Sequence, residues 1–154
     1  MIGPTDLVVP LFAVYYRKAE PIDCYPMFLW RNDEDTVKTT KRQNKVAQKE
    51  HIDWFIKHMN EILIAEEFGE DDVSRTSNQV CAFRLSKTRE LSWIVAPKHR
   101  GQQLGYTLIS PQIRKTSLTW ARIREDNIAS QKIASSGGME KIFTLNQIQY
   151  WIKL

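Results

Sequence analysis

Hydrophobic and polar positions alternate in short runs along most of the chain, and turn-forming residues separate these runs. Runs rich in β-branched and aromatic residues are typical of strands. They lie at 11–17, 62–68, 79–85, 90–96 and 117–123, and the tail from 139 predicts two more strands around Asn146. Helical patterns fall between them. This order predicts an α/β or α+β domain with helices on both faces of a sheet.

One helix has a clear amphipathic pattern. The residues Ile52, Phe55, Ile56 and Met59 recur at the spacing of one helical face, which predicts a helix over 49–60 that buries these side chains.

The histidines His51, His58 and His99 have no spacing typical of a metal site, so we expect each of them to be solvated or on a helix surface.

Two further helices contain prolines. Pro26 should interrupt a helix that begins at Pro21, because proline lacks the amide that a helix interior needs. For the same reason Pro111 should kink or shorten a helix over 103–114. A last helix over 126–136 ends at a Gly-Gly pair, a common helix terminator.

The stretch 33–49 is polar and charged without a lasting period, which predicts a long loop; loops of this length are usually functional or mobile. Its basic side chains are Lys38, Lys41, Arg42, Lys45 and Lys49. Such a run usually forms a solvated face. The alternative is that it attracts an anionic ligand such as a nucleotide-sugar diphosphate.

Composition limits the function classes. A chain of 154 residues with 42% hydrophobic content predicts a single domain over 1–154. The net charge of +4 does not indicate nucleic-acid binding, and the two cysteines have no metal-like spacing. The longest apolar run, 7–16, is too short to span a bilayer and lacks the pattern of a signal peptide. We therefore expect a cytoplasmic protein without metal, nucleic-acid or membrane partners.

The stretch IVAPKHRGQQLGYTLI at 94–109 combines a strand, a glycine-containing loop and a helix. Gly101 and Gly105 would let the backbone approach a ligand, and the free amides at a helix N-terminus bind phosphate. The loop is neither a P-loop nor a dinucleotide fingerprint. Spacing alone supports an ordinary strand-to-helix turn equally well.

The longer run LSWIVAPKHRGQQLGYTLI resembles the acetyl-coenzyme A binding motif of the GNAT superfamily of N-acetyltransferases. In that motif a strand ends in Val-x-Pro, and Arg/Gln-x-x-Gly-x-Gly/Ala leads into a helix. Arg100 and Gly105 match its first and last places, while Gln103 replaces the middle glycine. DNIASQKIASSGGM at 126–139 resembles the family's Asn-x-x-Ser helix with its glycine turn. Two such motifs in the right order are more specific than either alone.

A third stretch, FLWRNDEDTVKTT followed by EHIDWF, looks like the Trp-Arg-Asn segment of the branch that acetylates amino groups on nucleotide-linked sugars. It is more loosely similar to the branch that acetylates ribosomal-protein N-termini. Trp30, Arg31 and Asn32 are therefore the candidate residues for binding the acceptor.

The resemblance implies a mixed, mostly antiparallel central sheet of six to seven strands, with helices on both faces and a splayed strand pair that holds acetyl-coenzyme A. The pyrophosphate would lie on loop amides, and the pantetheine arm would add to the sheet as an extra strand. A strand amide would polarise the thioester carbonyl. The cofactor-binding candidates are Ile94, Val95, Arg100, Gly101, Gln102, Gln103, Leu104, Gly105, Tyr106, Asn127, Ser130 and Lys132.

The implied reaction transfers an acetyl group to a primary amine. The favoured acceptor is an amino group on a nucleotide-linked sugar, and a protein or peptide N-terminus is the second candidate. A non-catalytic domain that binds acyl-coenzyme A is the alternative outside enzymes. Assembly as a homodimer is left open.

The attacking amine must be neutral, so a base is useful. Glu90 is the first candidate because it shares a strand face with Ser92 and Ile94. Glu90 could instead form a purely structural ion pair with Arg84, Lys87 or Arg89 at a sheet edge. Glu66 and Glu67 are weaker candidates for the base. The family often places a tyrosine acid in the Asn-x-x-Ser helix, where this chain has Ala134; Ser130, Tyr106, water or no acid at all are the remaining options.

Overall fold

The computed structural model describes residues 14–67, 78–101 and 103–154, so the first part of the expected strand 11–17 and the turn after residue 68 lie outside the described residues. A four-stranded and a three-stranded sheet together contain seven described strands. The first sheet has the order β2 (Val14–Lys18), β3 (Ile62–Glu67), β4 (Gln79–Leu85) and β5 (Leu91–Val95). The second has the order β6 (Thr119–Arg124), β8 (Ile148–Lys153) and β7 (Glu140–Leu145). Neighbouring strands within both sheets are antiparallel, which confirms the expected fold class.

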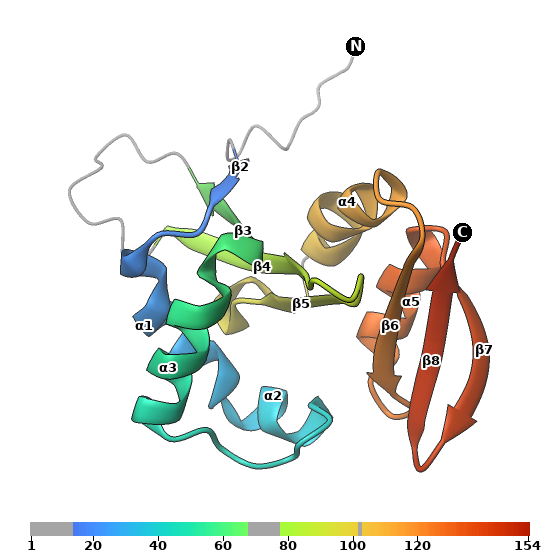
Figure 1. The fold of residues 1–154 in the computed structure, drawn as a ribbon, viewed down its shortest axis with the longest axis horizontal. Helices are drawn as coiled ribbons and strands as arrows, with labels where there is room; N and C mark the ends of the chain where they lie inside the picture. Colours follow the sequence, from blue (N-terminus) through green and yellow to red (C-terminus); the bar gives the residue numbers. More distant parts are fainter. Residues whose placement is uncertain (1–13, 68–77, 102) are drawn as a thin grey trace.

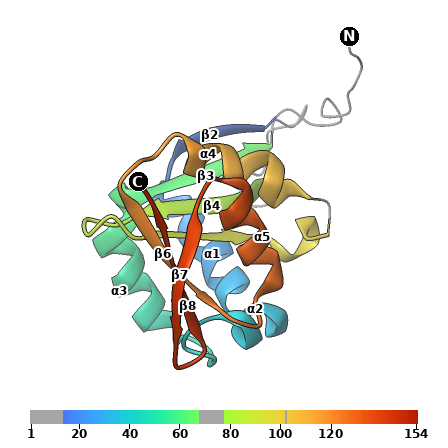
Figure 2. The ribbon, with the colours of Figure 1, turned by 90° about the vertical axis from the view of Figure 1, so that its right-hand side faces the viewer.

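Helices cover both faces of the first sheet (Figures 1 and 2). The helices are α1 (Cys24–Arg31), α2 (Glu34–Thr39), α3 (Gln48–His58), a π-helical turn over Gly105–Ile109, α4 (Ser110–Arg114) and α5 (Ile128–Ser136). On one face, α1 and α3 bury Met27, Trp30 and Phe55 against the sheet. On the other face, the turn before α4, α4 itself and α5 bury a second apolar cluster that includes Ile109, Ile113 and Ile133. Burial of these two faces stabilises the sheet from both sides.

The two sheets meet at a single parallel contact. Glu90 pairs with Trp120, and the Trp120 amide donates to the Arg89 carbonyl at 3.1 Å. Beyond this contact, β5 and β6 do not pair within the described part of the chain. The strands therefore diverge from a closed end at Glu90, as Figure 1 shows.

Both prolines are accommodated at helix starts. Pro26 lies in the first turn of α1, where a missing amide removes no helical bond, so α1 continues to Arg31 and is not interrupted at Pro26. The expected short or broken helix is nevertheless present, as a 3₁₀ helix over Pro21–Asp23 followed by α1 with 8 residues. Before Pro111, the Ser110 amide bonds to the Gly105 carbonyl five residues back. The disturbance predicted for Pro111 is thus confirmed as a π-helical turn.

Helix α2 lies within the stretch expected to be a loop, so that prediction is wrong over residues 34–39. The Asp33 side chain caps the helix by accepting a hydrogen bond from the Thr36 amide at 3.4 Å. Glu34 and Asp35 in the first turn also favour a helix N-terminus. This capping signal was present in the sequence, whereas an apolar period was not.

Helix α3 forms as predicted but buries a different face. Phe55 is buried, while Ile52 and Ile56 are exposed. His51 is buried as well, and its Nε2 lies 2.9 Å from the Cys24 carbonyl. The expectation of a solvated His51 is therefore wrong, because α3 packs on α1 through its aromatic side.

Candidate active site

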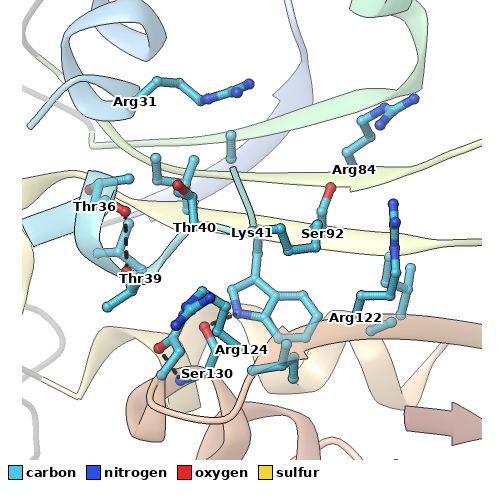
Figure 3. A pocket seen from close by; sticks show the side chains of 18 of the residues that line it. Arg31, Thr36, Thr39, Thr40, Lys41, Arg84, Ser92, Arg122, Arg124 and Ser130 are labelled. Carbon is cyan, nitrogen blue, oxygen red and sulfur yellow. Dashed lines mark hydrogen bonds between the residues drawn. The ribbon is translucent and has the colours of Figure 1, made fainter. Parts of the chain in front are cut away.

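A pocket of about 540 Å³ occupies the space between the diverging strands. Its lining comes from both sheets, from α1, α2 and the segment after α2 on one side, and from α5 on the other (Figure 3). We call the part lined by α1, α2 and the segment after α2 the α1 side, and the part lined by α5 the α5 side.

The edge of β5 that faces the pocket carries backbone groups that do not bond to β4. The Glu90 carbonyl accepts from the amide of Ser86, just after β4, at 2.9 Å, and the Ala96 amide donates to the Val80 carbonyl of β4 at 2.8 Å. Because bonding alternates along an antiparallel strand, the backbone groups of Trp93 and Val95 point away from β4, toward β6. An extended ligand could pair with them as an added strand. The sequence predicted this pairing near Ile94 and Val95; Val95 lies on this edge, whereas the backbone groups of Ile94 point toward β4.

The loop after β5 has the backbone conformation that its glycine pattern predicts. Gly101 has φ of +78°, and Gln103 has φ of +60°, a left-handed value that favours glycine. Gln103 therefore takes the conformation expected of the glycine that it replaces in the GNAT motif.

Gly105 is required for a different reason. A Cβ at this position would lie 2.3 Å from Ile133 Cδ1, so the helix after the loop can approach α5 only with glycine here. Leu104 is buried beneath the loop, Tyr106 is exposed, and Gln102 lies outside the described residues.

Arg100 braces the loop against α2. Its guanidinium pairs with Asp33 at 2.8 Å and donates to the Thr36 hydroxyl, while Nε donates to the Val95 carbonyl at 3.2 Å. Burial opposes ionisation of Asp33, but the bonds from Arg100 and from the Thr36 amide lower its pKa below the usual value. Arg100 thus connects the cap of α2 to the end of β5.

The helix α5 presents two polar residues to the pocket. The Asn127 side chain caps the helix by accepting from the Ser130 amide at 3.2 Å. The Ser130 hydroxyl accepts from the Trp93 indole N–H at 3.2 Å, so a hydrogen bond crosses from β5 to α5. Asn127 and Ser130 line the pocket, whereas Lys132 is exposed and lies outside its lining.

Glu90 lines the pocket at its closed end. Its carboxylate accepts two hydrogen bonds from the Arg122 guanidinium of β6, at 2.7 and 3.1 Å. The sequence suggested a structural partner among Arg84, Lys87 and Arg89, and the structure gives Arg122 instead. No signal in the sequence identifies a partner 32 residues away.

Of the three acceptor candidates, the structure brings only Arg31 to the pocket. Trp30 is buried in the core between α1 and the sheet. The Asn32 side chain bonds to the Val46 amide and carbonyl at 2.8 and 2.9 Å. Trp30 and Asn32 therefore support the α1 side of the pocket from behind rather than line it.

The weaker candidates for the base lie away from the pocket lining. Glu66 is buried and pairs with Arg17, and Glu67 lies 3.1 Å from His99. Ala134 is fully buried and supplies no acid. Among the described residues, no group of His, Cys, Asp and Glu side chains could hold a metal ion, and no helix is long and apolar enough to cross a membrane.

No protein-family model matches the chain, and no curated protein matches its sequence. Solved structures are similar to it. A domain from Methanocaldococcus jannaschii DSM 2661 has a TM-score of 0.76 at 18% identity, over 93% of this chain and 99% of its own. An acetyltransferase of the GNAT family from Bacillus anthracis has a TM-score of 0.71 at 15% identity, over 90% and 92%. The chain has the GNAT fold.

A further structure with the GNAT fold is the spermidine N-acetyltransferase from Vibrio cholerae in complex with CoA and spermine. It has a TM-score of 0.65 at 13% identity and covers 90% of this chain and 93% of its own. At these identities the similarity establishes the fold alone, and it does not distinguish the nucleotide-sugar branch from others.

Proposed function

We propose that the chain is an acetyl-coenzyme A-dependent N-acetyltransferase that acts on a primary amine. The observation that carries this proposal is the pocket-facing edge of β5 at Trp93 and Val95, which does not bond to β4 and leads into a loop with left-handed backbone at Gly101 and Gln103. The loop opens onto the helical segment that begins at Gly105, so that amides are available for a pyrophosphate. The GNAT fold supports the same assignment.

The residues present fit the cofactor. The Arg100 amide donates to the Pro97 carbonyl at 3.2 Å, so backbone amides of the loop from Gly101 to Tyr106 would hold its pyrophosphate, and the edge of β5 would hold its pantetheine arm. Asn127 and Ser130 would line the arm on the α5 side. When bound, acetyl-coenzyme A supplies the activated acetyl group as a thioester. An amide of the β5 edge would donate to the thioester carbonyl and stabilise negative charge on its oxygen.

Glu90 is the proposed general base. Its carboxylate lies at the closed end of the pocket, where Arg122 holds it in one orientation. From there it would accept a proton from the ammonium group of the acceptor, directly or through water, and leave the neutral amine that attacks. No described side chain takes the place of the usual tyrosine acid at Ala134, so the thiolate would leave with a proton from Ser130, Tyr106 or water, or without one.

For the acceptor we propose an amino group on a nucleotide-linked sugar. Arg31, Lys41 and Arg42 line the α1 side of the pocket, and such side chains bind diphosphates. The peptide N-terminus remains the second candidate. A polyamine such as the spermine bound by the Vibrio cholerae enzyme is disfavoured, since its positive charges would meet cations here.

The proposal is tested in two steps. Isothermal titration of CoA should show binding, and release of free thiol from acetyl-coenzyme A should depend on an amine in a panel of sugar amines, peptides and polyamines. Binding of CoA without turnover on any of these amines would favour a non-catalytic acyl-coenzyme A-binding domain. Absence of CoA binding would reject the cofactor assignment itself.

A further inference from the structure

Four basic side chains from separate parts of the fold converge on one region of the pocket. They are Arg31 of α1, Lys41 of the segment after α2, Arg84 of β4 and Arg122 of β6. Figure 3 shows Arg31 and Arg84 on the side opposite Arg124 and Ser130, while Arg122 extends from β6. Arg31 of α1 and Lys41 of the segment after α2 therefore belong to the α1 side, away from the α5 side, where the cofactor would lie.

Two of these cations are neutralised by carboxylates and two are not. Arg122 pairs with Glu90 at 2.7 Å, and Arg84 pairs with Glu61 at 2.8 Å. Within the described residues, neither Arg31 nor Lys41 forms an ion pair.

The environment of the two unpaired cations opposes their charge. Burial lowers the pKa of Arg31, and nearby Arg42 lowers it further while Glu50 opposes the change. Arg31 also lies over the Trp54 ring, 5.6 Å from its centroid, which fixes the guanidinium beside the pocket.

Lys41 lies within the field of the other three members of the cluster. Desolvation lowers its pKa, and Arg122, Arg31 and Arg84 lower it further, while the Glu90 charge opposes them. An arrangement of like charges raises the free energy of the empty site, and an anion placed among them would relieve it.

We propose that Arg31 and Lys41 form an anion subsite that binds a phosphate or carboxylate group carried by the acceptor. This inference rests on the proposed function and deepens it, because it names the part of the site that selects the acceptor. Arg84 and Arg122 add positive potential while staying bound to their own carboxylates. The subsite selects amines that carry a negative group and rejects polyamines.

Binding of simple anions tests the subsite without any turnover. Inorganic pyrophosphate and malonate are titrated calorimetrically into the protein saturated with CoA, so that the loop after β5 is occupied. Lys41→Met and Arg31→Gln should each weaken anion binding about tenfold or more, as expected when a charged hydrogen-bond partner is removed. Lys57→Met and Arg114→Gln, which remove equal charges from exposed positions outside the pocket lining, should leave binding unchanged.

The two probes also identify the preferred anion. Binding of pyrophosphate alone assigns the subsite to a phosphate group, and binding of malonate alone assigns it to a carboxylate. The inference is overturned if neither anion binds, or if the control variants weaken binding as much as Lys41→Met does. If CoA itself does not bind, the proposed function fails, and the same titrations without CoA still decide whether anion binding depends on Lys41 and Arg31.

Turnover gives a second readout with a matched pair of acceptors. Glucosamine 6-phosphate and glucosamine differ only in one phosphate group. Lys41→Met should raise KM for the phosphorylated amine about tenfold more than it raises KM for the neutral amine. A loss of equal size for both amines would mean that Lys41 acts on folding or on the cofactor, and would refute the subsite.

Discussion

Glu90 and Arg122 form a two-bond ion pair, with distances of 2.7 and 3.1 Å, at the point where the two sheets meet. The pair joins the start of β5 to β6, just beside the parallel contact of Glu90 with Trp120. One carboxylate thus has two roles available, as the proposed base and as the link that closes one end of the pocket.

Replacing Glu90 with Gln should separate these roles. If Glu90 is the base, Glu90→Gln lowers kcat by roughly 10²- to 10⁴-fold, the usual range for general base catalysis, and leaves CoA affinity intact. The pH profile of kcat/KM should lose its acidic limb.

Arg122→Gln is the matched control, since it removes the ion pair but keeps the carboxylate. It should retain the pH-dependent limb. An unchanged pH profile in Glu90→Gln would remove Glu90 as the base and leave it the structural role alone.

Gln103→Gly should stabilise the protein. The left-handed backbone at Gln103 costs about 1 kcal/mol for a residue with a Cβ, and glycine avoids that cost. The greater freedom of glycine in the unfolded chain offsets part of this gain, so we expect a net increase of about 0.5 kcal/mol in the free energy of unfolding. Urea unfolding of the variant and the parent measures this difference in the free energy of unfolding. Gln103→Ala keeps the strained conformation and should bring no such gain; a Gly variant less stable than the parent would contradict the assignment.

Gly105→Ala should destabilise the protein through one contact. The added Cβ would meet Ile133 Cδ1 at 2.3 Å, and overpacking of this kind costs about 1–3 kcal/mol. Because Ile133→Val removes that methyl group, it should recover part of the loss in a double-mutant cycle. Gly101→Ala should also destabilise, since φ is +78° there, but nothing lies within 4 Å and Ile133→Val should bring no recovery. If Ile133→Val recovered as much stability with Gly101→Ala as with Gly105→Ala, the packing argument would be contradicted.

The buried Asp23 should make stability depend on pH. Burial by itself raises the pKa of Asp23, but hydrogen bonds from Arg17, the Glu20 amide and Gln79 outweigh it and hold the pKa below its usual value. A lowered folded-state pKa adds stability that is fully present above the unfolded-state pKa, near pH 4, and that is lost as pH falls toward the folded-state value.

Asp23→Asn tests this dependence by urea unfolding at pH 7 and pH 3. The variant should lose about 3 kcal/mol at pH 7, because the half-buried Arg17 loses a partner, and the gap to the parent should narrow at pH 3. Asp53→Asn, which breaks the exposed pair with Lys49, should change stability little at either pH. If the difference in the free energy of unfolding between Asp23→Asn and the parent is the same at pH 7 and pH 3, the Asp23 charge does not cause the pH dependence of stability.

Local features of the chain were readable from the sequence. Strand β4 has the predicted bounds 79–85, because a run of β-branched and aromatic residues favours an extended backbone. The hairpin around Asn146 was predicted as well, and Asn146 and Gln147 both have the positive φ that tight hairpin turns need. The loop at Gly101 and the end of α5 at the Gly-Gly pair belong to the same class, since each depends on residues close in sequence.

The tertiary structure decided which residues come together at the candidate site. The pairing of Glu90 with Arg122, the burial of His51 and the approach of Arg31 to Lys41 all depend on how separate elements pack. A periodic pattern indicates that a helix has an apolar face, but the neighbouring helix determines which face is buried, and in α3 it selected the aromatic one. The sequence by itself determined the strands, the turns and the cofactor-type loop, because these follow from short-range backbone preferences. Only the tertiary structure brought four cations from distant segments to one pocket, because electrostatic interactions depend on distances in space and not on separation along the chain.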